Sequence, residues 1–210
     1  MSTEQIATRN DLNLGSSTYY DSELLKIHDY FNIITLPLIF VSNWIQLIFG
    51  DIFGFDYLFY LFLGYILLDL LWLIWKPKSV GSPGTIIFHH VISAGGWMIP
   101  IFNQDLALLT RLALLVEFNT WFNILKRYYK TDLVYNCFYI TWFFLRVILY
   151  PTLFYMSLNK YLLYITKFGS YFNLALPILI ICVSLTILNF IWSYELIVKK
   201  GYLGVSSKKD

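Results

Sequence analysis

The chain has 210 residues, of which 58% are hydrophobic and only 13% are charged. A soluble domain has roughly 45–50% apolar and 25% charged residues, so this composition excludes a soluble protein and indicates one embedded in a membrane. The formal net charge of +2 is too small to indicate nucleic-acid binding, and no run of Lys and Arg interleaved with aromatic residues occurs. We therefore expect no nucleic-acid partner.

Six segments are apolar and long enough for helices that cross the membrane, which need about 20 residues each. They comprise residues 31–50, 56–75, 86–102, 106–126, 133–157 and 172–197. Each is bounded by a cluster with Gly, Pro, Asn, Asp or Lys, residue types that form turns or end helices. The sequence predicts an all-α polytopic membrane protein, in which residues 31–198 form a bundle of six transmembrane helices around a polar-lined cavity.

Two segments fit this pattern less well than the others. Gly95, Gly96 and Pro100 interrupt the third candidate, and we interpret the two glycines as positions where helices approach closely. Residues 160–168 follow the fifth candidate and are interpreted as a short interfacial piece.

Lys and Arg residues concentrate on one side of the predicted bundle, and the side rich in them normally faces the cytosol. That side would carry Arg9, Lys26, Lys76, Lys78, Lys126, Arg127, Lys130, Lys199, Lys200, Lys208 and Lys209, whereas the other side would carry only Lys160 and Lys167. We therefore expect the N-terminal segment 1–30 and the tail 199–210 in the cytosol. The ending SSKKD resembles a displaced dilysine retrieval signal and points to the endoplasmic reticulum.

Ionisable side chains inside the predicted spans are the first candidate functional residues, because such groups normally face the bundle interior or a watery cavity. Asp69 lies in the second span, and His89 and His90 begin the third span from the same side of the membrane. The three residues are therefore at similar depth, which permits an Asp–His hydrogen bond. Two adjacent imidazoles point about 100° apart on a helix, so at most one of them works at a small site.

Further polar residues lie in the fourth and fifth spans. Glu117, Thr120 and Asn123 spread along one side of the fourth span, whereas Asn119 faces away from Glu117 and receives no role. Arg146 lies near the middle of the fifth span, where we expect it to pair with a carboxylate such as Glu117. All of these groups also fit structural clasps between helices, and the sequence leaves both interpretations open.

Five stretches resemble the TLC-domain family, the membrane-protein group that includes the ceramide synthases. In the order of that family, and covering about residues 65–197, they read GYILLDLLWLIWKP, FHHVIS, LLVEFNTWFN, FFLRVILYP and LNFIWSYELI. The resemblance implies an endoplasmic-reticulum or related membrane, a helical bundle that encloses a polar-lined cavity, and a role in lipid handling.

Ceramide synthases transfer an acyl group from acyl-CoA to the amino group of a sphingoid base, and their motif is a His pair followed by two aspartates on the next helix. His89 and His90 match the pair, Glu117 stands for the first carboxylate, and Thr120 replaces the second. The resemblance makes His89, His90, Asp69 and Glu117 the candidate catalytic residues. Thr120, Asn123 and Arg146 are the candidate ligand-binding residues.

Three functions remain open from the sequence. The favoured one is a multi-pass membrane protein of lipid homeostasis that binds a lipid or acyl chain in an intramembrane cavity. The alternatives are an acyl-CoA-dependent acyltransferase and a structural subunit or cargo receptor, which would have a membrane-protein partner. Motifs of the types GxGxxG, P-loop and HExxH are absent, so we expect no cofactor and no metal, and acyl-CoA enters only as a substrate.

Overall fold

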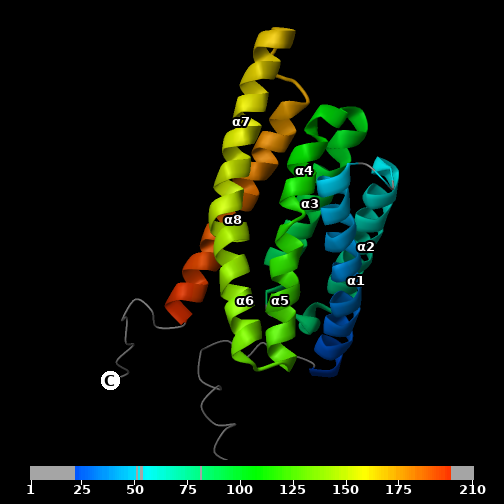
Figure 1. Cartoon of the computed structure of the whole chain (residues 1–210), viewed down its shortest axis with the longest axis vertical. Helices are drawn as coiled ribbons and strands as arrows, with labels where there is room; N and C mark the ends of the chain where they lie inside the picture. The colour runs from blue at the N-terminus through cyan, green and yellow to red at the C-terminus, as the bar shows by residue number, and fades with distance from the viewer. Residues whose placement is uncertain (1–21, 51, 53, 81, 200–210) are drawn as a thin grey trace, which may run out of the picture.

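The computed structural model describes residues 22–50, 52, 54–80 and 82–199, and in this part of the chain every regular element is a helix (Figure 1). The α-helices are α1 (Ser22–Phe49), α2 (Phe55–Trp75), α3 (Pro83–Phe102), α4 (Ala107–Ala113), α5 (Val116–Tyr128), α6 (Asp132–Trp142), α7 (Leu149–Phe168) and α8 (Ala175–Lys199). Two short 3-10 helices, η2 (Pro77–Ser79) and η3 (Gln104–Leu106), precede α3 and α4, and a π-helical segment, η4 (Phe143–Ile148), joins α6 to α7.

Six helical segments are long and apolar enough to cross a membrane, which confirms the predicted all-α bundle. They are spans 1 to 6 in chain order: Glu23–Phe49, Asp56–Trp75, Pro83–Phe102, Gln104–Tyr128, Asp132–Phe168 and Ala175–Val198. Span 4 consists of η3, α4 and α5, and span 5 of α6, η4 and α7. The retrieval-like ending and most of the predicted N-terminal segment and tail lie outside the described residues.

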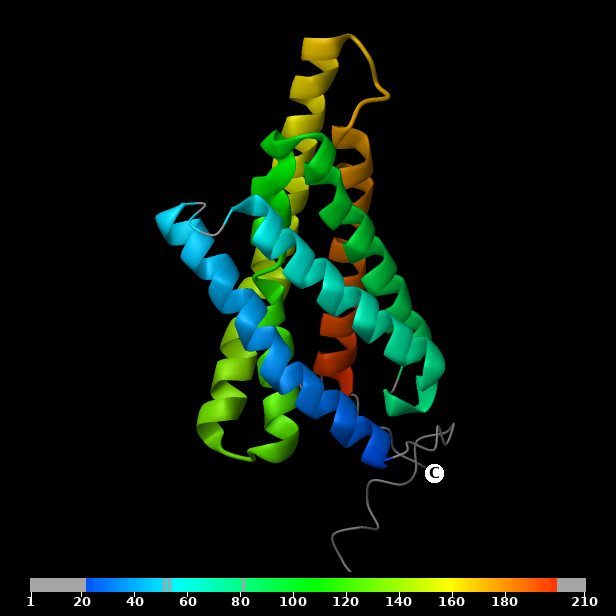
Figure 2. The same ribbon diagram turned by 90° about the vertical axis from the view of Figure 1, so that its right-hand side faces the viewer.

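The spans close into a ring. Helix α1 packs on α2 and α5, α2 on α3, α3 on α8, α8 on α7 and η4, and α6 on α5. The turned view shows α1 crossing the front of the bundle obliquely, with α3 toward the right-hand edge (Figure 2). Because α1 begins and α8 ends at the same end of the ring, we call this end the terminal end (Figure 1).

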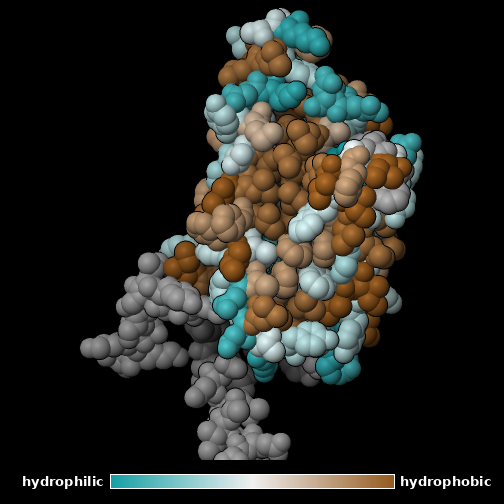
Figure 3. Space-filling model, in the orientation of Figure 1, coloured by the Kyte–Doolittle hydropathy of each residue, from teal (hydrophilic) through white to brown (hydrophobic). Residues whose placement is uncertain are grey.

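The visible outer face of the bundle is apolar around its middle and more hydrophilic toward its two ends (Figure 3). Large side chains such as Leu71, Ile140 and Ile180 are exposed there, as suits a surface that meets lipid tails. Aromatic rings fill the interface between α1 and α5, where Phe40 makes edge contacts with Phe118 and Trp121. The apolar band and the packed interior together fit a bundle that lies within a bilayer.

The turn between α1 and α2 and the contact between α3 and α8 depend on glycine. Gly50 and Gly54 have φ angles of 86° and 77°, a region that other residues rarely occupy, so the chain reverses there at little steric cost. A Cβ atom on Gly96 would lie 3.2 Å from Cγ2 of Ile181 on α8, which confirms the predicted close approach at this position. Gly95 has no atom within 4 Å of such a Cβ, so the prediction does not hold there.

Two helix boundaries differ from the sequence prediction. Helix α1 begins at Ser22 rather than residue 31, because His28 and Asp29 are buried and find partners inside the bundle instead of ending the helix. Residues 160–168 are not a separate interfacial piece but the last turns of α7, which ends only where Gly169 adopts a left-handed conformation with φ 64°. Pro100 does not break α3, which continues to Phe102.

Candidate functional site

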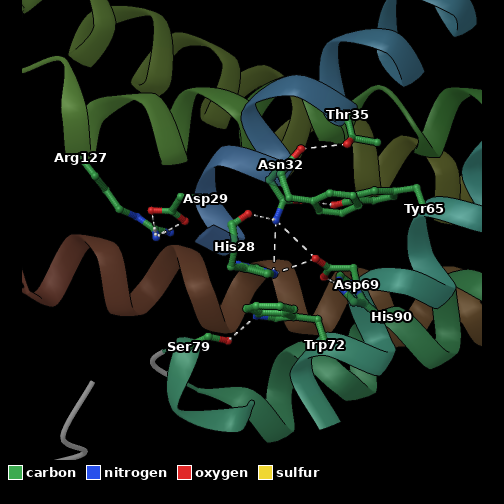
Figure 4. Close-up of polar contacts among 11 residues, drawn as sticks. His28, Asp29, Asn32, Thr35, Tyr65, Asp69, Trp72, Ser79, His90 and Arg127 are labelled. Atoms are coloured by element: carbon green, nitrogen blue, oxygen red, sulfur yellow. Dashed lines mark hydrogen bonds and ion pairs between the residues drawn. The ribbon is translucent and has the colours of Figure 1, made fainter. Parts of the chain in front are cut away.

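Asp69 on α2 is the centre of a buried polar network formed by the first three spans (Figure 4). Its side chain is only 3% exposed, and its carboxylate accepts a hydrogen bond from Nε2 of His28 at 2.7 Å and another from Nε2 of His90. Nδ2 of Asn32 donates to the same carboxylate at 3.3 Å. Helices α1, α2 and α3 therefore meet at one acidic group, and the predicted Asp–His hydrogen bond is present between Asp69 and His90.

The network extends from Asp69 to two aromatic residues. The hydroxyl of Tyr65 donates to Oδ1 of Asn32 at 2.7 Å, and the ring of His28 stacks on that of Trp72 with centroids 6.4 Å apart. Nε1 of Trp72 donates in turn to the hydroxyl of Ser79 in η2 at 3.2 Å. The His28 ring is thus held by a hydrogen bond at Nε2 and by stacking on one face. It is a site residue that the sequence did not predict.

A second acidic group, Asp29, ties α1 to α5 near the terminal end. Nη1 of Arg127 donates to both carboxylate oxygens, at 2.7 and 2.8 Å, and the hydroxyl of Tyr128 donates to Oδ2 at 3.0 Å. The Asp29 side chain is 1% exposed, whereas that of Arg127 is 39% exposed. This ion pair, which we call the clasp, lies beside the Asp69 network but is not joined to it in Figure 4.

Arg146 lies in the π-helical segment of span 5. Pro151 follows closely and has no N–H, so regular α-helical bonding cannot continue through the turn before it, which accounts for the wider turn. Nε of Arg146 donates to Oδ1 of Asn119 at 2.6 Å, Nη1 to Oδ1 of Asn189 at 2.8 Å, and Nη2 to Oγ1 of Thr120 at 3.1 Å. All three acceptors are neutral oxygens.

The Arg146 guanidinium lies in a cradle formed by Asn119, Thr120 and Asn189. This cradle corrects one prediction and gives a structural role to one residue. Arg146 was expected to pair with Glu117, but its hydrogen bonds go to amide and hydroxyl groups, and its interaction with Glu117 is only electrostatic. Asn119, which had no assigned role, accepts from Arg146 and donates to the Phe138 carbonyl at 3.0 Å. The amide thus links span 4 to span 5.

His89 lies between the Asp69 network and the Arg146 cradle. Its ring contacts that of His90 at 5.6 Å and that of Trp192 on α8 at 5.5 Å, and the Arg146 guanidinium lies 5.4 Å from the Trp192 ring. Nδ1 of His89 and Nδ1 of His90 are buried without a hydrogen-bond partner in the protein. Buried polar atoms normally find partners, so two unsatisfied nitrogens side by side indicate a place for a polar guest.

A partly open space of about 380 Å³, the chamber, lies inside the ring. Its wall includes all seven residues that the sequence analysis proposed, namely Asp69, His89, His90, Glu117, Thr120, Asn123 and Arg146, together with His28, Asp29 and Asn119. Small-molecule sites usually measure about 300–1,000 Å³, so the chamber is large enough for a ligand. The structure thus brings the predicted residues together in one wall, although their roles stay predictions.

A smaller apolar space of about 50 Å³, the pouch, adjoins the chamber. His89 and Glu117 line both spaces, and the rest of the pouch wall is mainly apolar, with Trp97, Leu109 and Leu185 among its residues. Among the described residues, no group of three or more His, Cys, Asp and Glu side chains is arranged to hold a metal ion. The site therefore consists of the polar chamber and the adjoining apolar pouch.

The ring of apolar helices and the polar chamber inside it define a multi-pass helical membrane protein with an intramembrane cavity. The family model for the TLC domain matches residues 23–198, and the chain belongs to the TLC-domain family. Comparisons with curated proteins and with solved structures found no match. The match also begins close to the start of α1, so the family domain includes the helix that carries His28.

The Asp69 network predicts a specific loss of stability. Asp69→Asn keeps the shape of the side chain but replaces one acceptor oxygen by a donor that faces an imidazole N–H, so the free energy of unfolding should fall by about 1–3 kcal/mol. Asp56→Asn is the matched control, because Asp56 is exposed in the first turn of the same helix. Thermal unfolding in detergent micelles measures both variants, and equal midpoints would contradict the central role of Asp69.

Proposed function

We propose that this protein binds a membrane lipid or an acyl chain in its chamber, and that it serves lipid homeostasis in this way. The main support is a chamber of about 380 Å³ at membrane depth, lined by His, Asp, Glu and Arg side chains inside a ring of apolar helices. Ionisable groups at this depth are costly, so a purely structural bundle would do better with apolar residues. A polar headgroup surrounded by lipid needs such a lining.

Arg146 is the best-placed anchor for the headgroup. A guanidinium has five N–H donors, and three hydrogen bonds of Arg146 go to neutral oxygens of Asn119, Asn189 and Thr120. Its charge therefore keeps the capacity to bind a phosphate or carboxylate, and two N–H groups stay available. Thr120 holds Arg146 in place, and Asn123 adds a further amide to the chamber wall.

The pouch suits the hydrocarbon part of such a ligand. It opens off the chamber at His89 and Glu117, and its wall is made mainly of apolar side chains. A space of about 50 Å³ admits only a few methylene groups, since one water-sized group needs roughly 10–15 Å³. An amphiphile would thus place its polar group against Arg146 and the start of a chain past His89.

A second candidate function is acyl transfer, with acyl-CoA as the donor. The observation that favours it is His90, whose Nε2 is held by Asp69 while its Nδ1 is buried without a protein partner. An imidazole oriented by a carboxylate is a suitable general base or acyl carrier, with His89 and Glu117 beside it. Thr120 is already bonded to Arg146, so binding rather than chemistry explains that residue.

We also propose that the terminal end of the bundle faces the cytosol and that the membrane is that of the endoplasmic reticulum. The support is the basic side chains at this end, which include Lys76, Lys78, Arg127 and Lys130, whereas Lys160 and Lys167 lie in the far part of span 5.

Lipid retention tests the binding proposal. After purification and detergent exchange, the wild-type protein should retain lipid, which extraction and mass spectrometry identify. Asn123→Trp fills part of the chamber and should remove most of this lipid, and Arg146→Gln should remove the acidic species selectively. Asn136→Trp on the exposed face of α6 is the matched control and should retain lipid like the wild type. A wild-type protein that retains none would leave the polar cluster as a structural feature of a subunit or cargo receptor.

Acyl transfer has its own test. Purified protein is incubated with labelled acyl-CoA and either sphingoid bases or lysophospholipids, and products are separated by chromatography. If His90 acts as base or carrier, His90→Ala abolishes product formation, whereas the exposed-face variant Asn136→Trp forms product like the wild type. Complete absence of product from the wild type, together with an unchanged cellular lipidome in a His90→Ala strain, would reject this candidate.

Cysteine labelling in sealed microsomes tests the orientation. With Cys137 and Cys182 replaced, Lys130→Cys should react with a membrane-impermeant maleimide, because its loop joins α5 to α6 at the terminal end. Lys167→Cys near the end of α7 should react only after the membrane is permeabilised. The reverse pattern would place the terminal end in the lumen.

A further inference from the structure

The ring of helices is not equally closed at each of its seams, where a seam is the line along which two neighbouring spans meet. Span 6 packs against span 5 through η4 and α7, that is, from Phe143 onward. Helix α6, the part of span 5 at the terminal end, packs on α5 instead. No comparable packing joins α6 to α8 within the described part of the chain.

The pictures show the same divergence. In Figure 1 the last turns of α8 run away from α6 toward the side of the bundle, and in the turned view of Figure 2 the two helices also stay apart at the terminal end. The chamber reaches this seam from inside, because its wall includes Phe138 and Trp142 of α6 and Trp192 and Leu196 of α8. Among the described residues, the α6–α8 seam is therefore a side of the chamber without extensive helix–helix packing.

Other seams around the chamber are bridged by polar contacts. The clasp between Asp29 and Arg127 joins α1 to α5, and the hydrogen bonds of Asp69 join α2 to both α1 and α3. The hydrogen bond from Arg146 to Asn189 joins η4 to α8 only at the inner end of the α6–α8 seam. A guest that enters at the α1–α5, α1–α2 or α2–α3 seam has to separate these polar partners, whereas the side chains that α6 and α8 contribute to the chamber wall are aromatic or aliphatic.

The chemistry of the seam suits a lipid. Its lining is aromatic and aliphatic, and the ammonium group of Lys126 lies 3.4 Å from the centre of the Phe138 ring at the edge nearest the terminal end. The Trp192 ring lines the seam and also faces the Arg146 guanidinium. Hydrocarbon can pass along the rings while a charged headgroup moves from Lys126 to Arg146.

We propose that the α6–α8 seam is the entrance through which a lipid of the adjacent leaflet moves sideways into the chamber. This inference rests on the proposed lipid binding and adds that the ligand comes from the membrane at the terminal end rather than from water. The ligand is then a membrane-resident lipid with an acidic or otherwise polar headgroup.

A reversible closure of the seam tests the entrance. In a variant without Cys137 and Cys182, Trp142→Cys and Leu196→Cys place one thiol on each side. Bis-methanethiosulfonate reagents of several lengths bridge the two thiols through disulfides, which dithiothreitol cleaves. The probe is fluorescently labelled phosphatidic acid in phosphatidylcholine vesicles, added to protein in lipid nanodiscs, and its transfer into the chamber is followed by energy transfer from tryptophan. Bridging should abolish most of the loading rate, and reductive release of the bridge should restore that rate in the same sample.

The outcomes separate the two proposals. Failure of unbridged and wild-type protein to take up the probe or to retain any lipid would overturn the binding function itself. Uptake that continues at an unchanged rate in the bridged protein would overturn only the entrance.

If the variant with the two introduced cysteines does not fold, photolabelling of the wild-type protein tests the entrance instead. Phosphatidic acid with a diazirine in its chain should label peptides of α6 and α8 in a manner that excess unlabelled lipid suppresses. Saturable labelling confined to the segment between α2 and α3 would instead show entry along the axis of the bundle and contradict the inference.

Discussion

The structure depends on one buried carboxylate, that of Asp69. A charge in an apolar interior is tolerable only when donors surround it, and Asp69 receives hydrogen bonds from His28 and Asn32 of α1 and from His90 of α3. These bonds require three helices to place particular residues at one height, so they determine how the first three spans are aligned. The wall of the chamber on this side follows from that alignment.

Arg146 presents the complementary case on the other side of the chamber. A cation held by a carboxylate would be largely neutralised, whereas Arg146 is positioned by the oxygens of two amides and one hydroxyl. Its orientation is therefore determined without loss of its charge. The chamber thus contains a carboxylate that is already bonded to imidazoles and a cation whose hydrogen bonds go to neutral groups, a combination that suits recognition of an anion better than it suits stability.

Much of the fold and part of the candidate site were predictable from the sequence, because the hydrophobic length of a span and the depth of a residue follow from simple geometry. Those rules identified six spans and brought Asp69 to the level of His90. They failed for His28, since the polar first turns of α1 look like a soluble segment unless their partners on α2 are known. They also failed for the Arg146 partner, because three neutral oxygens from two other spans depend on the rotation of each helix, which a single sequence does not specify.

The length of span 5, in which α6, η4 and α7 follow one another without a loop, has a consequence for the bilayer around it. Its 37 residues extend about 55 Å at 1.5 Å per residue, whereas the hydrocarbon layer is about 30 Å thick. A rod of that length must lean strongly or project beyond the hydrocarbon at its far end, where Lys160, Thr166 and Lys167 tolerate water. A thinner membrane therefore requires either more tilt of this helix, as far as its packing on α8 permits, or a longer projection into water.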